Sequence, residues 1–456
     1  MRHKKSSKTT ESSQRLNKGD EDWHRVGFIG ISNWVLDPAK MNRGIFVNRC
    51  SPSVNELKDT VIGICKNDEN VLLILESKNL INSLSNAYLK LCEIARNKTR
   101  EFFGLRDFYS LIKMIYWHIK QNGSGSMDWS FLNKAIKRNF GGLVDIDPTI
   151  PFMKQFKEDK IDLNFTACKI SVIDLIKEAL LKKTTEDENR YLLLLSQNDY
   201  ALDLINNYIL NEFASDSRET TSSNVKIIFG SSFPNDQKYH QICRKIHQIK
   251  LSMELGKTVI LLNLENLYES LYDALNQFYH KFGDNDKFVD LGLGTQRVKC
   301  LVHEKFRLIV VADKKSVYNP KKYPIPLVNR LEKHLLGLDS ILSDKMKWMV
   351  KNISDWCKHI TSSSDKNSGF HSSFIQNLKK KTCYLNESDI FIGFTEDTIS
   401  SLVFKIFKDY NLRENLSMDD YENSEFDWIK HAEKIIELVR IYLIQCACSD
   451  GITFPN

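Results

Sequence analysis

The sequence predicts an α/β protein that is rich in helices. Short continuous apolar runs, such as Val225–Phe229 and Phe306–Ala312, are typical of strands buried on both faces of a sheet. Longer stretches, such as Val54–Cys65 and Leu80–Ala95, carry apolar residues at helical spacing. Only nine prolines and nineteen glycines occur in 456 residues, which favours helices. We therefore expect parallel strands with flanking helices.

Composition excludes several classes of protein. The chain carries 64 basic and 58 acidic residues, and this net charge of +6 is too balanced to indicate a nucleic-acid-binding protein. No apolar run approaches the roughly 18 residues that a membrane-spanning helix needs. The ten cysteines are scattered without a Cys-x-x-Cys pair, so we expect reduced, cytosolic thiols and no metal site.

One stretch, Phe28–Arg43, combines a strand, a polar turn and a basic helix. The apolar run Val26–Ile31 predicts a buried strand that precedes Asn33, and Pro38 is placed to open a short helix. An amide at the carboxyl end of a strand can hold a water near a phosphate, and an arginine further on can reach a neighbouring site. Spacing alone also allows a core strand, a turn and an amphipathic helix without any ligand.

This stretch resembles the sensor-1 and arginine-finger segment of AAA+ ATPases, in which a strand and an asparagine precede Leu-Asp-Pro-Ala and arginines. Further segments resemble one family, mysterin, the giant RING-finger ubiquitin ligases built on a dynein-like AAA+ core. These segments are Glu101–Lys113, Phe229–Gln237, Asn263–Asn276 and Pro324–His334. The resemblance covers about residues 23–410.

The resemblance implies AAA+ P-loop NTPase-like units, each a parallel sheet with flanking helices, together with helical lid subdomains. It also implies a nucleotide site. Asn33 would bind the cofactor as the sensor-1 residue, and Arg43 would have a catalytic role as an arginine finger. The phosphate-binding loop and the Walker B strand of that unit do not precede Phe28, and no Gly-x-x-x-x-Gly-Lys-[Ser/Thr] occurs in the chain.

Two further arginines receive roles from the resemblance. Arg106 resembles a sensor-2 arginine, which binds the γ-phosphate from a lid, and Arg330 is the candidate catalytic finger of a second unit. The residues alone leave simpler alternatives open. Arg106 could form a helix cap or pair locally with Asp107, and Arg330 could pair with Glu332 or with a helix end.

A second unit is predicted to start at Val225 and to be a pseudo-ATPase. Gly230–Gln237 would occupy the place of the phosphate-binding loop, but Asp236 stands where the lysine is needed and would repel phosphate. The strand that begins at Thr258 would take the Walker B place. Asn263 there replaces the magnesium-binding aspartate, so we expect no hydrolysis although Glu265 has the charge of a catalytic base.

Composition and pattern, together with what the resemblance implies, divide the chain into six segments. They are a disordered tail at 1–22, the end of an AAA+ core at 23–52, its helical lid at 53–140, a helical connection and linker at 141–224, the second core at 225–335, and a lid with C-terminal helices at 336–456. Within them, helices are expected at Ile170–Lys183, Asn189–Phe213 and Tyr268–His280.

The resemblance implies part of the AAA+ core of a mysterin-like E3 ubiquitin-protein ligase. The parent would use ATP and Mg²⁺, act in the cytosol and at lipid droplets, and transfer ubiquitin from an E2 enzyme through modules outside this chain. The partners of this chain would be neighbouring AAA+ units, with no nucleic acid and no membrane span. We expect the chain alone to bind no cofactor and to be inactive.

Two alternatives remain from the sequence. The chain could be a non-enzymatic AAA+-derived scaffold that uses no nucleotide, which the missing phosphate-binding loop favours. It could also be part of another dynein- or midasin-like ATPase, but no pattern of a long coiled-coil stalk is present.

Overall fold

The computed structural model describes most of residues 27–447. The residues outside the description are 1–26, 33–36, 49–50, 99–101, 124–126, 166–169, 181–189, 198–200, 211–223, 232, 269, 284–285, 294–295, 320–321, 363–386, 414–427 and 448–456. Two units are separated by their internal contacts, residues 1–53 and residues 54–456, and each is described by itself.

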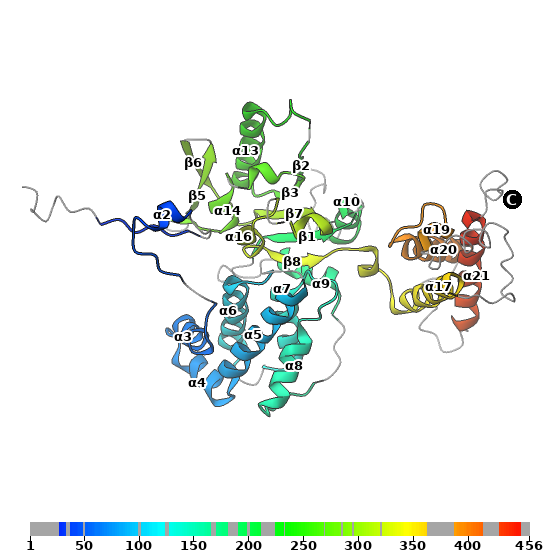
Figure 1. Cartoon of the computed structure of the whole chain (residues 1–456), viewed down its shortest axis with the longest axis horizontal. Helices are drawn as coiled ribbons and strands as arrows, with labels where there is room; N and C mark the ends of the chain where they lie inside the picture. Colours follow the sequence, from blue (N-terminus) through cyan, green and yellow to red (C-terminus); the bar gives the residue numbers. More distant parts are fainter. Residues whose placement is uncertain are drawn as a thin grey trace, which may run out of the picture. The chain divides into compact units, whose positions relative to one another are not determined.

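A parallel sheet of five strands forms the centre of the larger unit (Figure 1). Its order is β2-β3-β7-β1-β8, and every pairing is parallel. The strands are β1 (Leu192–Ser196), β2 (Val225–Phe229), β3 (Thr258–Leu262), β7 (Arg307–Asp313) and β8 (Glu332–Leu335). The predicted α/β class is confirmed.

Both faces of this sheet are buried, which explains why its strands are continuous apolar runs. In β1, Leu192 and Leu194 pack into a core with helices on one face, whereas Leu193 and Leu195 pack into the larger core on the other. The first face is covered by α9 (Val172–Leu180), α10 (Ala201–Leu204) and the π-helical turn η3 (Ile205–Leu210).

The prediction of a helix at Asn189–Phe213 is wrong. Its first part is the interior strand β1, which lies between β7 and β8, and all five residues of that strand are buried. A short run of leucines satisfies a doubly buried strand as well as a helix, so periodicity could not separate the two. The sheet of the predicted second AAA+ unit therefore begins at Leu192 rather than at Val225.

The helix predicted for Tyr268–His280 is also wrong in extent. Leu267, Leu271 and Leu275 are buried at helical spacing, but the helix is confined to α14 (Tyr272–Leu275) after a 3₁₀ turn, η4 (Glu265–Leu267). The chain leaves helical geometry at Gln277, whose φ is 55°. It then enters an antiparallel sheet of β4 (His280–Phe282), β5 (Asp286–Leu293) and β6 (Gln296–Leu301).

A helical subdomain shares its core with the other face of the sheet. It consists of α3 (Val54–Cys65), α4 (Glu69–Ser77), α5 (Leu80–Lys98), α6 (Leu105–Asn122), α7 (Trp129–Phe140) and α8 (Thr149–Glu158). The predicted helical pattern of residues 53–140 is confirmed. Helix α7 packs against β8, and α13 (Tyr239–Glu254) packs against β3 and the antiparallel sheet.

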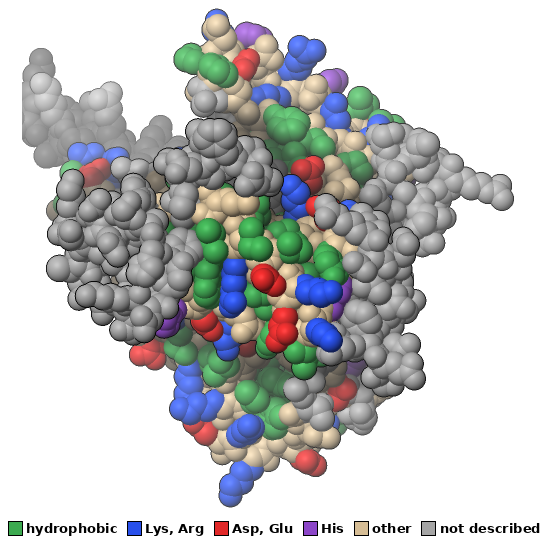
Figure 2. All heavy atoms as spheres, turned by 90° about the vertical axis from the view of Figure 1, so that its right-hand side faces the viewer, with side chains coloured by type: hydrophobic (Ala, Val, Ile, Leu, Met, Phe, Trp, Pro, Cys, Tyr) green, Lys and Arg blue, Asp and Glu red, His purple; other side chains and the backbone are tan. Residues whose placement is uncertain are grey.

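The C-terminal helices surround a separate core. They are α17 (Asp344–Ser362), α19 (Glu387–Ile390), α20 (Thr398–Arg413) and α21 (Trp428–Ala447), and three short elements precede them: α15 (Lys314–Val317), α16 (Ile325–Val328) and η5 (Leu338–Ser340). On the face that Figure 2 views, apolar side chains are mixed with charged ones. Helix α21 exposes Ile441 and Tyr442 among its apolar residues.

The N-terminal unit corrects one prediction and confirms another. Phe28–Ile31 forms no strand, and the Phe28 side chain is 90% exposed. A parallel strand needs hydrogen bonds from its neighbours, and no described strand pairs with this segment. The short helix exists as α2 (Pro38–Met41), which Asp37 caps by accepting the backbone N–H of Lys40 at 3.0 Å.

Candidate functional site

The strand order places the expected phosphate-binding loop after a different strand than the sequence analysis did. Ligands of open α/β sheets bind at the carboxyl ends of the strands, where the chain connections change direction. Here that point is strand β1, which lies between β7 and β8. The residues that follow it, Ser196-Gln197-Asn198-Asp199-Tyr200-Ala201, contain neither glycine nor lysine, and residues 198–200 lie outside the description.

The loop predicted for this role, Gly230–Gln237, follows the edge strand β2 instead. Gly230 has a different explanation. A Cβ atom at Gly230 would lie 1.4 Å from the carbonyl oxygen of Asn263, because the Gly230 N–H bonds the Leu262 carbonyl at 2.7 Å. The glycine therefore permits two backbones to approach closely.

The Glu265 carboxylate accepts a hydrogen bond from the Tyr323 hydroxyl at 3.3 Å.

The predicted residues of the first unit are only partly visible. Asn33 lies outside the described residues. Arg43 lies in the exposed turn after α2. Their roles therefore stay predictions.

Arg106 and Arg330, which the sequence assigns to different sites, line one cavity of about 410 Å³. Arg106 lies in the first turn of α6, and its guanidinium donates a hydrogen bond to the side-chain oxygen of Asn276. Arg330 follows α16 and is 5% exposed. Its guanidinium lies 3.4 Å from the centre of the Tyr272 ring, so α14 and the residue after it hold both arginines.

This cavity is called the basic cavity because four cationic side chains line it, and its charge could hold an anion. Arg106, Lys113, Arg190 and Arg330 all line it, and no aspartate or glutamate is among its described lining residues. Burial lowers the pKa of Arg330, and the charge of Arg106 acts in the same direction. The Nε atom of Arg330 is buried without a hydrogen-bond partner among the described residues. Such a cavity attracts anions.

A buried network of hydrogen bonds around Asp107 holds the residues beside the basic cavity in place. Asp107 accepts hydrogen bonds from Arg190 at 2.6 Å, from Lys333 at 2.8 Å and from the backbone N–H of Gly104 at 3.0 Å. Arg190 also donates to the Asn139 side chain at 3.0 Å. The Gly104 contact caps α6 at its start, so the network orients the turn that carries Arg106.

A second buried network lies beside the first. Arg138 of α7 donates two hydrogen bonds of 2.9 Å to the Glu332 carboxylate, and the His334 imidazole lies 2.9 Å from the same carboxylate. Burial opposes the ionisation of Glu332, but Arg138 and His334 outweigh it and lower the pKa of Glu332 from 4.5 to about 2. The bidentate pair joins α7 to β8.

These contacts contradict the two ion pairs that the sequence allowed as alternatives, Arg106 with Asp107 and Arg330 with Glu332. Asp107 pairs with Arg190 and Lys333 instead of Arg106, and Glu332 pairs with Arg138 instead of Arg330. The sequence reasoning missed Arg190 as a functional candidate, because its position in the cavity depends on strand β1.

Two parts of the chain match the profiles described as RNF213 AAA domain, at residues 182–342 and at residues 3–56. The chain is 38% identical over 420 residues to the E3 ubiquitin-protein ligase rnf213-beta of Danio rerio. The aligned region covers 91% of this chain and 8% of the relative. The chain belongs to the RNF213 family. The RNF213 ligases of Mus musculus and Homo sapiens are 38% and 39% identical to it, and each match covers 94% of this chain and 8% of the relative.

Membership in the RNF213 family confirms the predicted resemblance, because mysterin is another name for RNF213. The chain spans about 8% of the length of these relatives. The AAA match at residues 182–342 encloses all five strands from β1 to β8, in agreement with a sheet that begins at Leu192. The AAA+ α/β fold is thereby confirmed.

Two further features concern the described residues only. Among them, no helix is both long and apolar enough to cross a bilayer. They also contain no group of three or more His, Cys, Asp or Glu side chains placed to hold a metal ion.

Proposed function

We propose that this chain is a section of the AAA+ core of an E3 ubiquitin-protein ligase, and that the basic cavity contacts the phosphates of an ATP held by the preceding AAA unit. The observation that carries this proposal is the meeting of Arg106 and Arg330 in one cavity without a described carboxylate. One arginine comes from the helical subdomain and the other from the second unit, which is the arrangement of a nucleotide site shared between two units.

In this proposal the preceding unit supplies the phosphate-binding lysine and the Mg²⁺ ligands. Asn33 and Arg43 belong to the end of that unit. Arg106 binds the γ-phosphate, and Arg330 stabilises the negative charge that develops as the phosphate is transferred. The second unit is degenerate and binds no nucleotide, since no lysine follows β1. Ubiquitin, the E2 enzyme and the cytosolic and lipid-droplet locations belong to the parent.

ATP turnover by the full-length parent tests the proposal. Arg106→Ala and Arg330→Ala should each reduce turnover by about 10³-fold, the lower end of the effect of an arginine finger. Lys281→Ala, which removes an exposed charge on β4, is the matched control and should leave turnover unchanged. Normal turnover in both arginine variants would refute the assigned roles.

A non-enzymatic scaffold is the second candidate, favoured by the sequence after β1. It predicts that ATP turnover of the parent does not depend on Arg106 or Arg330. Calorimetry with ATP and Mg²⁺ on the 456-residue chain addresses a separate point. We expect no tight binding, because the phosphate-binding lysine is missing, and micromolar binding would show that the second unit is a live nucleotide site.

A further inference from the structure

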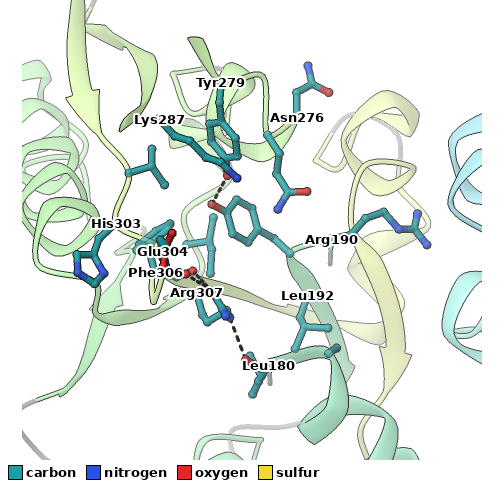
Figure 3. A pocket seen from close by; sticks show the side chains of 15 residues that line it. Leu180, Arg190, Leu192, Asn276, Tyr279, Lys287, His303, Glu304, Phe306 and Arg307 are labelled. Carbon is teal, nitrogen blue, oxygen red and sulfur yellow. Dashed lines mark hydrogen bonds between the residues drawn. The ribbon is translucent and has the colours of Figure 1, made fainter. Parts of the chain in front are cut away.

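A second cavity, of about 140 Å³, lies at the amino ends of the central strands (Figure 3). Tyr191, directly before β1, and Arg307, the first residue of β7, line it together with Leu180 at the end of α9 and Lys287 of β5. Ligands of open α/β sheets bind at the opposite, carboxyl ends of the strands. The cavity is therefore not the nucleotide position of the second unit.

Arg307 brings a partly buried positive charge to this cavity. Its Nε donates to the Leu180 carbonyl at 2.9 Å, and its Nη1 donates to the carbonyls of Glu304 at 2.8 Å and Phe306 at 2.7 Å (Figure 3). These bonds orient the guanidinium but do not neutralise it, and none of the ion pairs between described residues includes Arg307. Burial lowers the pKa of Arg307, which is the sign of a charge that lacks full solvation.

Lys287 adds a second cation. It is half-buried, its Nζ lies 5.8 Å from the centre of the Tyr279 ring, and no described carboxylate pairs with it. The hydroxyls of Tyr191 and Tyr279 lie 2.7 Å apart, and Figure 3 shows the Lys287 side chain beside them. Burial raises the pKa of Tyr191 well above its ordinary value, so its hydroxyl remains protonated at neutral pH.

The other charged side chains alter this balance little. Arg190 lines both cavities, but its guanidinium binds Asp107 and Asn139, and Figure 3 shows it turned away from this cavity. Glu304 is the one acidic residue among the described lining residues, and it is exposed. Arg307 and Lys287 are both half-buried and leave positive charge at the cavity, which an anion would neutralise.

We propose that this cavity binds a small oxyanion of the phosphate class. Lys287 and the Nη2 group of Arg307 would donate the charge-assisted hydrogen bonds that such an anion needs. The volume suits an inorganic phosphate but not a nucleoside, because an apolar cavity of about 150 Å³ holds one benzene molecule. A bound anion would join β5 to β7 and so attach the antiparallel sheet to the parallel sheet.

Calorimetric titration of the 456-residue chain with inorganic phosphate, at constant ionic strength set by chloride, tests the proposal. We expect saturable binding that Lys287→Gln weakens about tenfold or more, the effect of losing a hydrogen bond from a charged donor. Lys287→Arg should restore most of the affinity. Arg307 is left intact because its bonds to three carbonyls support the fold.

Two variants make the result specific. Lys281→Gln removes an equivalent exposed charge from β4 and should leave phosphate affinity unchanged. Lys113→Gln changes only the basic cavity, so a loss confined to this variant would place the phosphate there and overturn the proposal. Absence of saturable binding, or equal affinity of wild type and Lys287→Gln, would also overturn it. Neither result depends on ATP turnover, so the two proposals fail separately.

Discussion

Lys333 donates a hydrogen bond from Nζ to the Asp107 carboxylate at 2.8 Å, and both side chains are fully buried. Asp107 lies in the first turn of α6, and Lys333 lies in β8. Because Arg106 directly precedes Asp107, and Arg330 lies shortly before Lys333, this pair also fixes the positions of the two arginines relative to each other. The helical subdomain and the sheet are thereby joined at the basic cavity.

The buried pair should be sensitive to the loss of its acid. Asp107→Ala leaves Lys333 and Arg190 without their shared counter-charge, and we expect it to lower the free energy of unfolding by about 3–5 kcal/mol. Lys333→Met should cost less, because Arg190 still pairs with Asp107. Urea unfolding of the variants measures the order of these effects.

A surface pair provides the control for this prediction. Lys90 and Glu158 lie 3.0 Å apart, but their side chains are 47% and 45% exposed. Glu158→Ala should therefore cost less than about 1 kcal/mol. Equal losses for Asp107→Ala and Glu158→Ala would contradict the role of the buried network.

Glu332 should make the fold acid-sensitive. Its pKa is lowered from 4.5 to about 2 in the folded chain, so its ionisation stabilises the fold above pH 4.5. This contribution, about 3 kcal/mol, decreases below pH 4.5 and is lost as the pH falls through 2. Thermal unfolding between about pH 5 and pH 2, which spans the unfolded and folded pKa values of Glu332, measures this contribution. Glu332→Gln should remove this part of the pH dependence, and an unchanged slope in that variant would assign the acid sensitivity to other carboxylates.

The stacking of Arg330 on Tyr272 should orient the arginine. Tyr272→Ala removes the ring, and we expect a loss of about 1–2 kcal/mol in the free energy of unfolding. Under the proposed function it should also reduce ATP turnover of the full-length parent. Tyr272→Phe keeps the ring face and should retain both stability and turnover. If the alanine variant turned over ATP normally, the stack would have no positioning role.

Two glycines should respond oppositely to alanine. In Gly230→Ala the new Cβ would collide with the carbonyl oxygen of Asn263. The backbone must move to make room, so we expect the free energy of unfolding to fall by about 1–3 kcal/mol or more. Gly63 lies within α3 and has no atom within 4 Å of an added Cβ. Gly63→Ala should stabilise the chain by about 0.5–1 kcal/mol. Thermal unfolding compares them, and similar melting temperatures would refute the close approach at Gly230.

Local pattern was sufficient for several elements. The strands β2, β3 and β7 were predictable because their apolar runs are short and bounded by polar turns. Gly256, just beyond the end of α13, adopts a φ of 68°, the left-handed conformation that glycine favours after a helix C-terminus. The strand at Phe28–Ile31 failed because a strand exists only with partners, and the described chain provides none.

The sequence by itself determined the α/β class, the helical subdomain, the family and the two arginines that carry the proposal, because these depend on residue periodicity and on local motifs. Tertiary structure alone decided that β1 lies between β7 and β8, that the candidate phosphate-loop position follows it, and that Arg106 and Arg330 meet in one cavity. Strand order and the approach of distant side chains depend on long-range pairing, in which Asp107, far from Lys333 in sequence, becomes its neighbour in space.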